Sequence, residues 1–249
     1  MEKNFEDFLI EVFGDLPKGA PGSEELISKT FRLLKDLPIK PNILDIGCGW
    51  GMQTFILAEL SGGTITALDI IEEFLGRIDL KAQKLGLKDK IKTIKKSMLE
   101  MEFQDEEFDL IWCESAVYNI GFQKALHDWS KFLKTRGYLV ISEVIWLKSN
   151  PPINVKEFWD IEYPGIKWDK DNIEIIQNSG LKLIHSVPFE EKEWWDNYYT
   201  PLENKIKLLK NKYKDNTEFT DYLDRTQIEI DLYRKYSEFY GYIYYVIQK

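Results

Sequence analysis

Three glycines at alternate positions follow a short apolar run and form the clearest chemical motif in the chain. They are Gly47, Gly49 and Gly51, and residues 42–46 before them have the composition of a buried strand. Glycine lets a backbone turn sharply and approach a ligand closely, because a Cβ there would collide with it. Such a loop at the carboxyl end of a first parallel strand is typical of a nucleotide-like ligand site. The motif therefore predicts a cofactor site rather than a purely structural turn.

The glycine spacing separates two classes of cofactor. A dinucleotide fold has Gly-x-Gly-x-x-Gly, which sets a helix N-terminus against a pyrophosphate, whereas the third glycine here comes one residue early. The Asp45 carboxylate would repel a pyrophosphate and suit the ammonium of an amino acid, directly or through water. Asp69 ends the next apolar run, where a carboxylate can accept hydrogen bonds from two ribose hydroxyls. Together they favour S-adenosylmethionine, which carries an amino acid and an adenosine but no phosphate.

A parallel sheet is needed to bring these residues together. Short apolar runs alternate with helical patterns from residue 41 onward, which predicts βαβ units and a doubly wound sheet covered on both faces. The expected strands are residues 42–46, 64–69, 91–95, 108–113 and 138–144, and the expected helices between them are residues 51–60, 72–85 and 122–133.

The flanking regions are expected to be mainly helical. Helices are predicted at residues 2–13 and from Ser23 to about residue 36, before the sheet. The later elements are an irregular stretch from residue 150, a helix at 169–178, a sixth strand at 181–189, mostly helix over 201–236 and a closing strand at 241–247. We expect one domain over residues 1–249, made of N-terminal helices (1–40), a cofactor-binding core (41–148), acceptor-side loops with the sixth strand and a helical cap (149–240), and the last strand (241–249).

Four motifs in order resemble those of class I S-adenosylmethionine-dependent methyltransferases, over about residues 40–145. They are Asp45-Ile-Gly-Cys-Gly-Trp-Gly, Leu68-Asp69, residues 76–86 and Phe108-Asp-Leu-Ile-Trp. Residues 114–121 and the closing Tyr240-Gly-Tyr resemble the small-molecule group known as methyltransferase type 11. The resemblance implies a Rossmann-like seven-stranded sheet with an antiparallel last strand, N-terminal helices and a helical cap before that strand.

The same resemblance implies a set of site residues. Ser97 and Met98 follow the third strand, where the family contacts adenine, although many members have Asp in place of Ser97. Glu114 follows the fourth strand, where the methionine end of the cofactor and the acceptor meet. Gly22 and Ser23, ahead of the second helix, are expected to close over the cofactor. The predicted cofactor-binding residues are Ser23, Asp45, Gly47, Cys48, Gly49, Gly51, Gln53, Asp69, Ile70, Ser97, Met98 and Glu114.

Aromatic residues after residue 145 suggest an acceptor pocket, although some of them must pack the cap onto the sheet. Trp194 and Trp195 lie in an expected loop, where adjacent side chains point to opposite sides, so one should face the pocket. An aromatic pocket favours flat, apolar or cationic acceptors. The predicted pocket residues are Tyr118, Glu143, Trp146, Trp194, Trp195 and Tyr198, and the candidate catalytic residues are Glu114 and Tyr118.

Composition narrows the function further. The net charge of −9 argues against an extended nucleic-acid surface, and no apolar run is long enough to cross a bilayer. Two cysteines make neither a disulfide framework nor a metal cluster. We expect a cytoplasmic monomer or homodimer, without metal, that methylates a small-molecule acceptor by in-line transfer. The alternatives are a non-catalytic S-adenosylmethionine-binding regulatory module and, less favoured, an NAD-dependent oxidoreductase.

Overall fold

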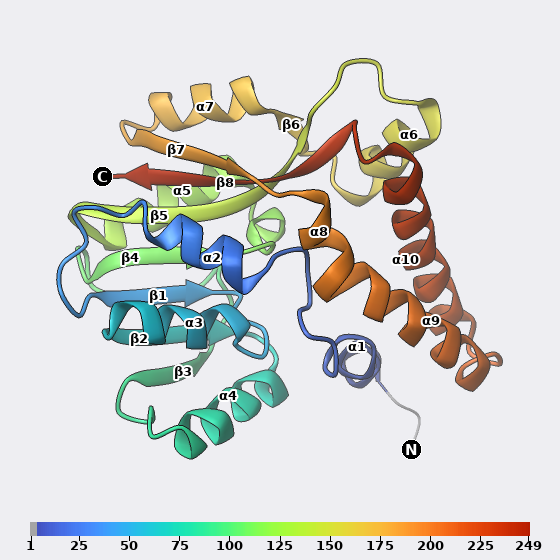
Figure 1. Cartoon of the computed structure of the whole chain (residues 1–249), viewed down its shortest axis with the longest axis horizontal. Coiled ribbons are helices and arrows are strands. Elements are labelled where there is room, and N and C mark those ends of the chain that lie inside the picture. The colour runs from blue at the N-terminus through green and yellow to red at the C-terminus, as the bar shows by residue number, and fades with distance from the viewer. Residues whose placement is uncertain (1–3) are drawn as a thin grey trace.

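Strand β1 (Asn42–Ile46) lies inside a mixed sheet in the computed structural model, which describes residues 4–249. The strand order is β3 (Ile91–Lys95), β2 (Thr64–Asp69), β1, β4 (Phe108–Cys113), β5 (Leu133–Trp146), β8 (Tyr240–Gln248) and β7 (Lys182–Pro188). Strands β1 to β5 run parallel, and β8 is antiparallel to both β5 and β7. Figure 1 shows β8 running against its neighbours. The Rossmann-like order with an antiparallel last strand is confirmed, and the short strand β6 (Lys167–Trp168) is added beside β5.

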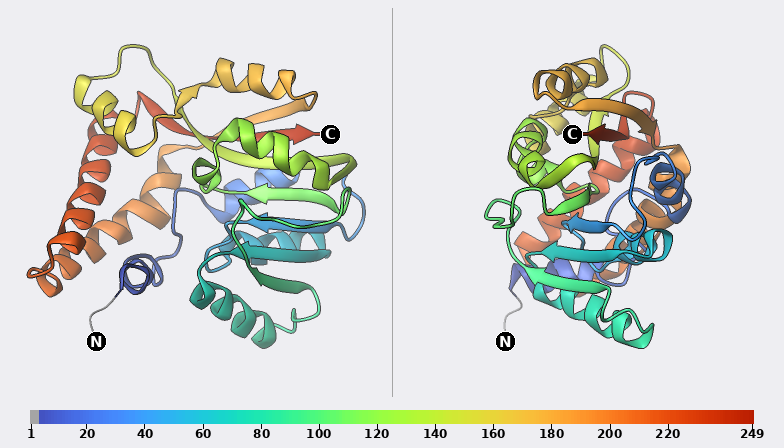
Figure 2. Two further views of the ribbon diagram at one scale, coloured as in Figure 1. Left: turned by 180° about the vertical axis from the view of Figure 1, so that it is seen from behind. Right: turned by 90° about the vertical axis from the view of Figure 1, so that its left-hand side faces the viewer.

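Helices cover both faces of this sheet. Helices α2 (Glu24–Phe31), α3 (Met52–Ser61) and α4 (Glu72–Lys84) pack on the face that includes Ile43 and Leu110. Helices α5 (Phe122–Trp129) and α7 (Asp169–Asn178) pack on the opposite face, against Leu44 and Ile111. Figure 2 shows the second face from behind. Successive residues of the central strands are therefore buried on opposite faces, which explains their continuous apolar sequence.

A third apolar cluster lies beyond the carboxyl ends of the parallel strands (Figure 1). It joins α1 (Phe5–Phe13), α6 (Ile153–Glu162), α8 (Glu191–Trp194), α9 (Thr200–Lys212) and α10 (Thr217–Tyr236). The Phe8 ring stacks on Phe219 with 4.1 Å between centroids, so the first helix is bound to the cap. No helix within residues 4–249 is long and apolar enough to cross a membrane.

Several predicted boundaries were wrong for identifiable reasons. Residues 153–162 form helix α6 instead of an irregular stretch, because Pro152 occupies the N-cap, where a proline does not interrupt helical hydrogen bonds. Residues 194–199 are helical, with a π-turn at 195–199, rather than a loop. Strand β5 begins at Leu133, inside the expected helix, and α2 ends at Phe31. Residues 2 and 3 of the first expected helix lie outside the described residues.

The central strands should account for much of the stability of the fold. Leu110 on β4 is completely buried. Truncation of Leu110 to alanine should lower the free energy of unfolding by about 2–5 kcal/mol, because it removes packed methyl groups and leaves a cavity. Denaturant unfolding followed by circular dichroism measures this change. Leu208→Ala on the exposed face of α9 is the matched control and should change stability by less than about 0.5 kcal/mol.

Candidate active site

The glycine loop after β1 has a backbone that only glycine adopts readily. Gly47 and Gly49 have φ values of 68° and 53°. A Cβ on Gly47 would lie 2.6 Å from the Ala116 Cβ, so close packing excludes a side chain there. A Cβ on Gly49 would meet no atom within 4 Å, because this residue borders open space. Gly47 is therefore required by packing, whereas Gly49 brings bare backbone to the edge of a cavity.

Asp69 ties the end of β2 to this loop. Its Oδ2 accepts a hydrogen bond from the Gly49 N–H at 2.9 Å, and its Oδ1 accepts one from the Ile71 N–H at 3.0 Å. The carboxylate is therefore fixed at the carboxyl edge of the sheet, beside the glycine loop. Each oxygen can accept further hydrogen bonds from a ligand in the cavity that Asp69 borders.

Asp45 lies beneath the loop and is not among the cavity-lining residues. It is fully buried, and it accepts hydrogen bonds from Thr54 Oγ1 at 2.6 Å and Gln53 Nε2 at 3.3 Å. Burial raises the pKa of the Asp45 carboxyl to about 7, although the hydrogen bonds from Thr54 and Gln53 oppose the shift. Of the two expected contacts with a cofactor ammonium, the direct one does not fit this position, and the one through water stays a prediction. Asp45 instead holds the start of α3, and Gln53 is the member of the network that borders the cavity.

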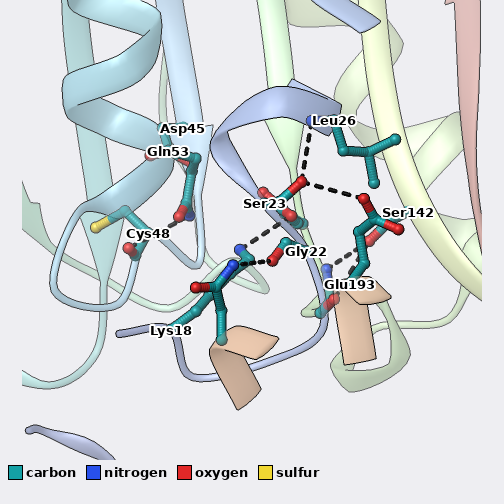
Figure 3. Close-up of polar contacts among 12 residues, drawn as sticks. Lys18, Gly22, Ser23, Leu26, Asp45, Cys48, Gln53, Ser142 and Glu193 are labelled. Carbon is teal, nitrogen blue, oxygen red and sulfur yellow. Dashed lines mark hydrogen bonds and ion pairs between the residues drawn. The ribbon is translucent and has the colours of Figure 1, made fainter. Parts of the chain in front are cut away.

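A buried ion pair lies where β4 ends. Lys18 Nζ is 2.9 Å from Glu114 Oε1, and the side chains are 5% and 0% exposed. A Cβ on Gly22 would lie 2.4 Å from the same Glu114 oxygen, so this glycine leaves room for the pair. Figure 3 shows Lys18 and Gly22 beside the glycine loop. Sequence reasoning found Glu114 but missed Lys18, which stands in a glycine- and proline-rich segment without a motif.

Ser23 has a structural role in this conformation and does not border the cavity. Its hydroxyl accepts a hydrogen bond from the Leu26 N–H at 3.1 Å, which caps α2, and donates to Glu193 Oε1 at 3.2 Å (Figure 3). The Gly22 N–H also donates to the Glu193 carbonyl at 2.8 Å. The segment before α2 is thereby attached to the cap, and its residues 18–21 line the cavity.

One cavity of about 710 Å³ joins these features to the cap. Met98 and Ser97 border it after β3, close to the end that Asp69 occupies, and Glu114 borders it after β4. The predicted cofactor residues that line it are Gly47, Cys48, Gly49, Gly51, Gln53, Asp69, Ile70, Ser97, Met98 and Glu114. Most of the cofactor-binding residues predicted from the sequence therefore line one end of the same cavity.

The predicted acceptor residues divide into two groups. Tyr118 and Tyr198 line the cavity, whereas Glu143, Trp146, Trp194 and Trp195 do not. Trp194 is 1% exposed and stacks on Tyr233 at 4.2 Å between centroids. The Arg234 guanidinium lies 5.0 Å from the Trp195 ring. Both tryptophans therefore pack the cap, because a helix replaces the expected loop.

Glu143 and Trp146 lie on β5. Glu143 is buried and accepts a hydrogen bond from the Val144 N–H at 3.2 Å. Burial raises the pKa of its carboxyl to about 8. Trp146 packs in the cap cluster.

Other residues complete the cavity wall, and some of them were missed. The residues that were missed are Glu162, Tyr222 and Glu229 of the cap and Tyr242 of β8, whereas Trp159 and Tyr163 belong to the aromatic residues after residue 145 that were expected near the acceptor. Tyr222 and Glu229 are seven residues apart on α10, so they share one helix face. In the sequence, a tyrosine and a glutamate at this spacing, on a helix face that would otherwise be apolar, could have indicated that this face lines a cavity.

Comparison with known proteins identifies the family. The sequence model described as a methyltransferase domain matches residues 40–205, which is more than half of the chain. The chain belongs to the methyltransferase domain family. This match extends into α9, so the methyltransferase domain includes part of the cap as well as the glycine loop.

Individual proteins are similar to the chain in sequence or in structure. The chain is 26% identical over 199 residues to a sterol 24-C-methyltransferase of Gibberella zeae, an alignment that covers 72% of this chain and 50% of that protein. It is 28% identical over 205 residues to an uncharacterised protein of Methanocaldococcus jannaschii, covering 76% and 84%. The chain thus spans about half the length of the sterol enzyme. The crystal structure of an S-adenosylmethionine-dependent methyltransferase from Geobacter sulfurreducens with S-adenosylhomocysteine matches with a TM-score of 0.82 at 17% identity, covering 96% of each chain.

The raised pKa of Asp45 in this methyltransferase domain predicts a pH dependence of stability. Below pH 3.8, the ordinary pKa of an aspartate, the Asp45 carboxyl is protonated in both the folded and the unfolded chain. Between pH 3.8 and about pH 7 it stays protonated in the folded chain but is ionised in the unfolded chain. Stability should therefore fall as pH rises between these values, by on the order of 4 kcal/mol, because a tenfold change in proton affinity is about 1.4 kcal/mol. The free energy of unfolding of Asp45→Asn, measured across this range, should lack this contribution. Asp105→Asn, an exposed control, should follow the wild type; identical profiles for all three proteins would refute the assignment.

The buried ion pair gives a second prediction. Lys18→Met should reduce the free energy of unfolding by about 3–5 kcal/mol, because it leaves the Glu114 carboxylate buried without its cation. Adding Glu114→Gln to the same chain should restore part of this loss, since the uncompensated charge is gone. Chemical denaturation of both variants measures the coupling. Equal stability of Lys18→Met and wild type would mean that the pair does not form in solution.

Proposed function

We propose that the chain is an S-adenosylmethionine-dependent methyltransferase that acts on a small-molecule acceptor. The observation that carries the proposal is the Asp69–Gly49 hydrogen bond, which sets a carboxylate and an open glycine backbone together at one end of the cavity. This pairing suits an adenosine whose ribose hydroxyls donate to Asp69. Ser97 and Met98 line the same end and would contact the adenine.

The middle of the cavity suits the amino acid part of the cofactor. Lys18 and Glu114 present opposite charges there, and an amino acid carries a carboxylate and an ammonium in matching proximity. Lys18 would bind the carboxylate and Glu114 the ammonium, so that binding replaces one buried ion pair with two. The segment at residues 18–21 borders this part of the cavity and would help to exclude water.

The cap end is left for the acceptor. S-adenosylmethionine supplies a sulfonium methyl that is already activated for displacement, so the chain has mainly to align the acceptor. Tyr118 borders the cavity from a short 3-10 helix (Val117–Asn119) that begins three residues after Glu114. The acceptor needs a base only if it must lose a proton, and Glu114 and Tyr118 are the candidates. Because sheet and cap line one cavity, catalysis is favoured over a non-catalytic binding module, and family membership disfavours an oxidoreductase.

Calorimetric titration tests the cofactor assignment. S-adenosylmethionine and S-adenosylhomocysteine should bind with micromolar dissociation constants, and NAD should not bind. Asp69→Ala and Gly49→Val should each weaken binding at least about a hundredfold. The first loses the ribose acceptor, and the second places a β-branched side chain in the open space beside a strained backbone.

Two controls make this result decisive. Asp89→Ala, an exposed change, should bind both compounds as the wild type does. Circular dichroism should show that the Asp69 and Gly49 variants remain folded. Normal binding by Asp69→Ala would disprove the ribose assignment. Cofactor binding without release of S-adenosylhomocysteine in a broad acceptor screen would favour the regulatory module.

A further inference from the structure

Tyrosine rings dominate the end of the cavity that faces the cap. They come from five separate segments, so the chain assembles them from distant positions in the sequence. The aromatic residues that line this end are Tyr118, Trp159, Tyr163, Tyr198, Tyr222 and Tyr242. Tyr118 and Tyr163 meet edge to face with 6.3 Å between centroids, and half of the Tyr118 surface remains exposed. Ring surface is therefore available to a bound molecule.

Glu229 of α10 brings a carboxylate among these rings. Its Oε1 accepts a hydrogen bond from the Tyr199 hydroxyl at 2.7 Å. Within residues 4–249, no lysine, arginine or histidine forms an ion pair with it. Burial raises the pKa of this carboxyl to about 7, opposed by the Tyr199 hydrogen bond and assisted by the Glu162 charge. An anion in such a place is costly unless a cation joins it.

Apart from Asp69 at the opposite end, the other charged side chains that line the cavity are paired. Glu114 has Lys18 at 2.9 Å, and Glu162 has Arg225 at 3.8 Å. Lys18 and Lys96 are the cationic residues that line the cavity within the described part of the chain, and Lys96 is paired with Glu102. A phosphate or carboxylate at the cap end would therefore find no free cation and would meet the Glu229 charge. A positively charged nitrogen would be attracted by that carboxylate and by the faces of the rings.

We infer that the methyl acceptor is a small amine that binds in its ammonium form between Glu229 and the tyrosine rings. If this nitrogen takes the methyl, it must first lose one proton, because an ammonium has no free electron pair, and the Glu229 carboxylate beside it would accept that proton. This inference rests on the proposed function, because it assigns the cap end of the cavity to the acceptor. The acceptor must be small, because it shares the cavity with the cofactor. A cavity of roughly 300–1,000 Å³ accommodates one drug-sized ligand, and this cavity of about 710 Å³ must also hold the cofactor.

Binding of choline tests the charge recognition without requiring turnover. Titrations are made in saturating S-adenosylhomocysteine with choline and with its uncharged analogue, in which carbon replaces the quaternary nitrogen. Choline should bind at least about tenfold more tightly than the analogue. Glu229→Gln should remove most of this preference, because it deletes the charge and keeps the shape. Tyr118→Leu should also weaken choline binding, whereas Glu218→Gln, an exposed change on the same helix, should leave it unchanged.

The outcomes separate the two proposals. Binding of S-adenosylhomocysteine alone tests the cofactor site, and retained binding by Glu229→Gln shows that this variant is folded. Equal binding of choline and its analogue by the wild type would overturn the amine assignment and leave the cofactor site intact. An unchanged choline affinity in Glu229→Gln would also overturn it. Methylation of an uncharged alkene or a phenol, at equal rates in wild type and Glu229→Gln, would overturn it as well.

Discussion

The site depends on the connection between β1 and α3. A strand that is buried on both faces must reverse into a helix within five residues, and it does so through a left-handed backbone at three glycines. Packing against Ala116 and Ile78 leaves no room for side chains at Gly47 and Gly51. Because its position is fixed in this way, the loop directs the Gly49 N–H toward Asp69. This hydrogen bond holds the carboxyl ends of β1 and β2 together. The other elements of the site are arranged around that fixed edge.

Polar groups at this edge are stabilised in two different ways. Asp45 is satisfied by neutral donors from α3, and its proton affinity rises as a result of burial. Glu114 instead has the Lys18 ammonium beside it, although it is equally buried. The carboxyl groups of these two residues, on adjacent strands, are therefore stabilised by different partners and differ in whether they border the cavity. The glycine loop separates them, with Asp45 beneath it and Glu114 on the cavity side.

Much of the sheet and one half of the site could be predicted from the sequence, because both depend on local patterns. Strand β1, the glycines and Asp69 follow one another within a short stretch whose spacing has a direct steric meaning. The cap could not be predicted in the same way. Trp194 was expected in an extended loop, but tertiary packing against Tyr233 stabilises a helix there. Lys18 and Glu229 acquire their roles only through partners far away in the chain, which no local pattern records.

The link between Gly22 and Glu193 has a consequence for how the chain folds. These residues are separated by about 170 positions, and their hydrogen bond closes the segment over the cavity. Contacts between residues so far apart in the sequence form slowly, because entropy is lost in closing the loop before the contact stabilises the chain, so local structure forms first. During synthesis, α1 and the segment that contains Gly22 emerge from the ribosome long before α8, so the contact of this segment with α8 can form only after most of the chain has been made. We therefore expect the segment around Gly22 and its contact with α8 to fold late, and the carboxyl edge of the sheet to fold first.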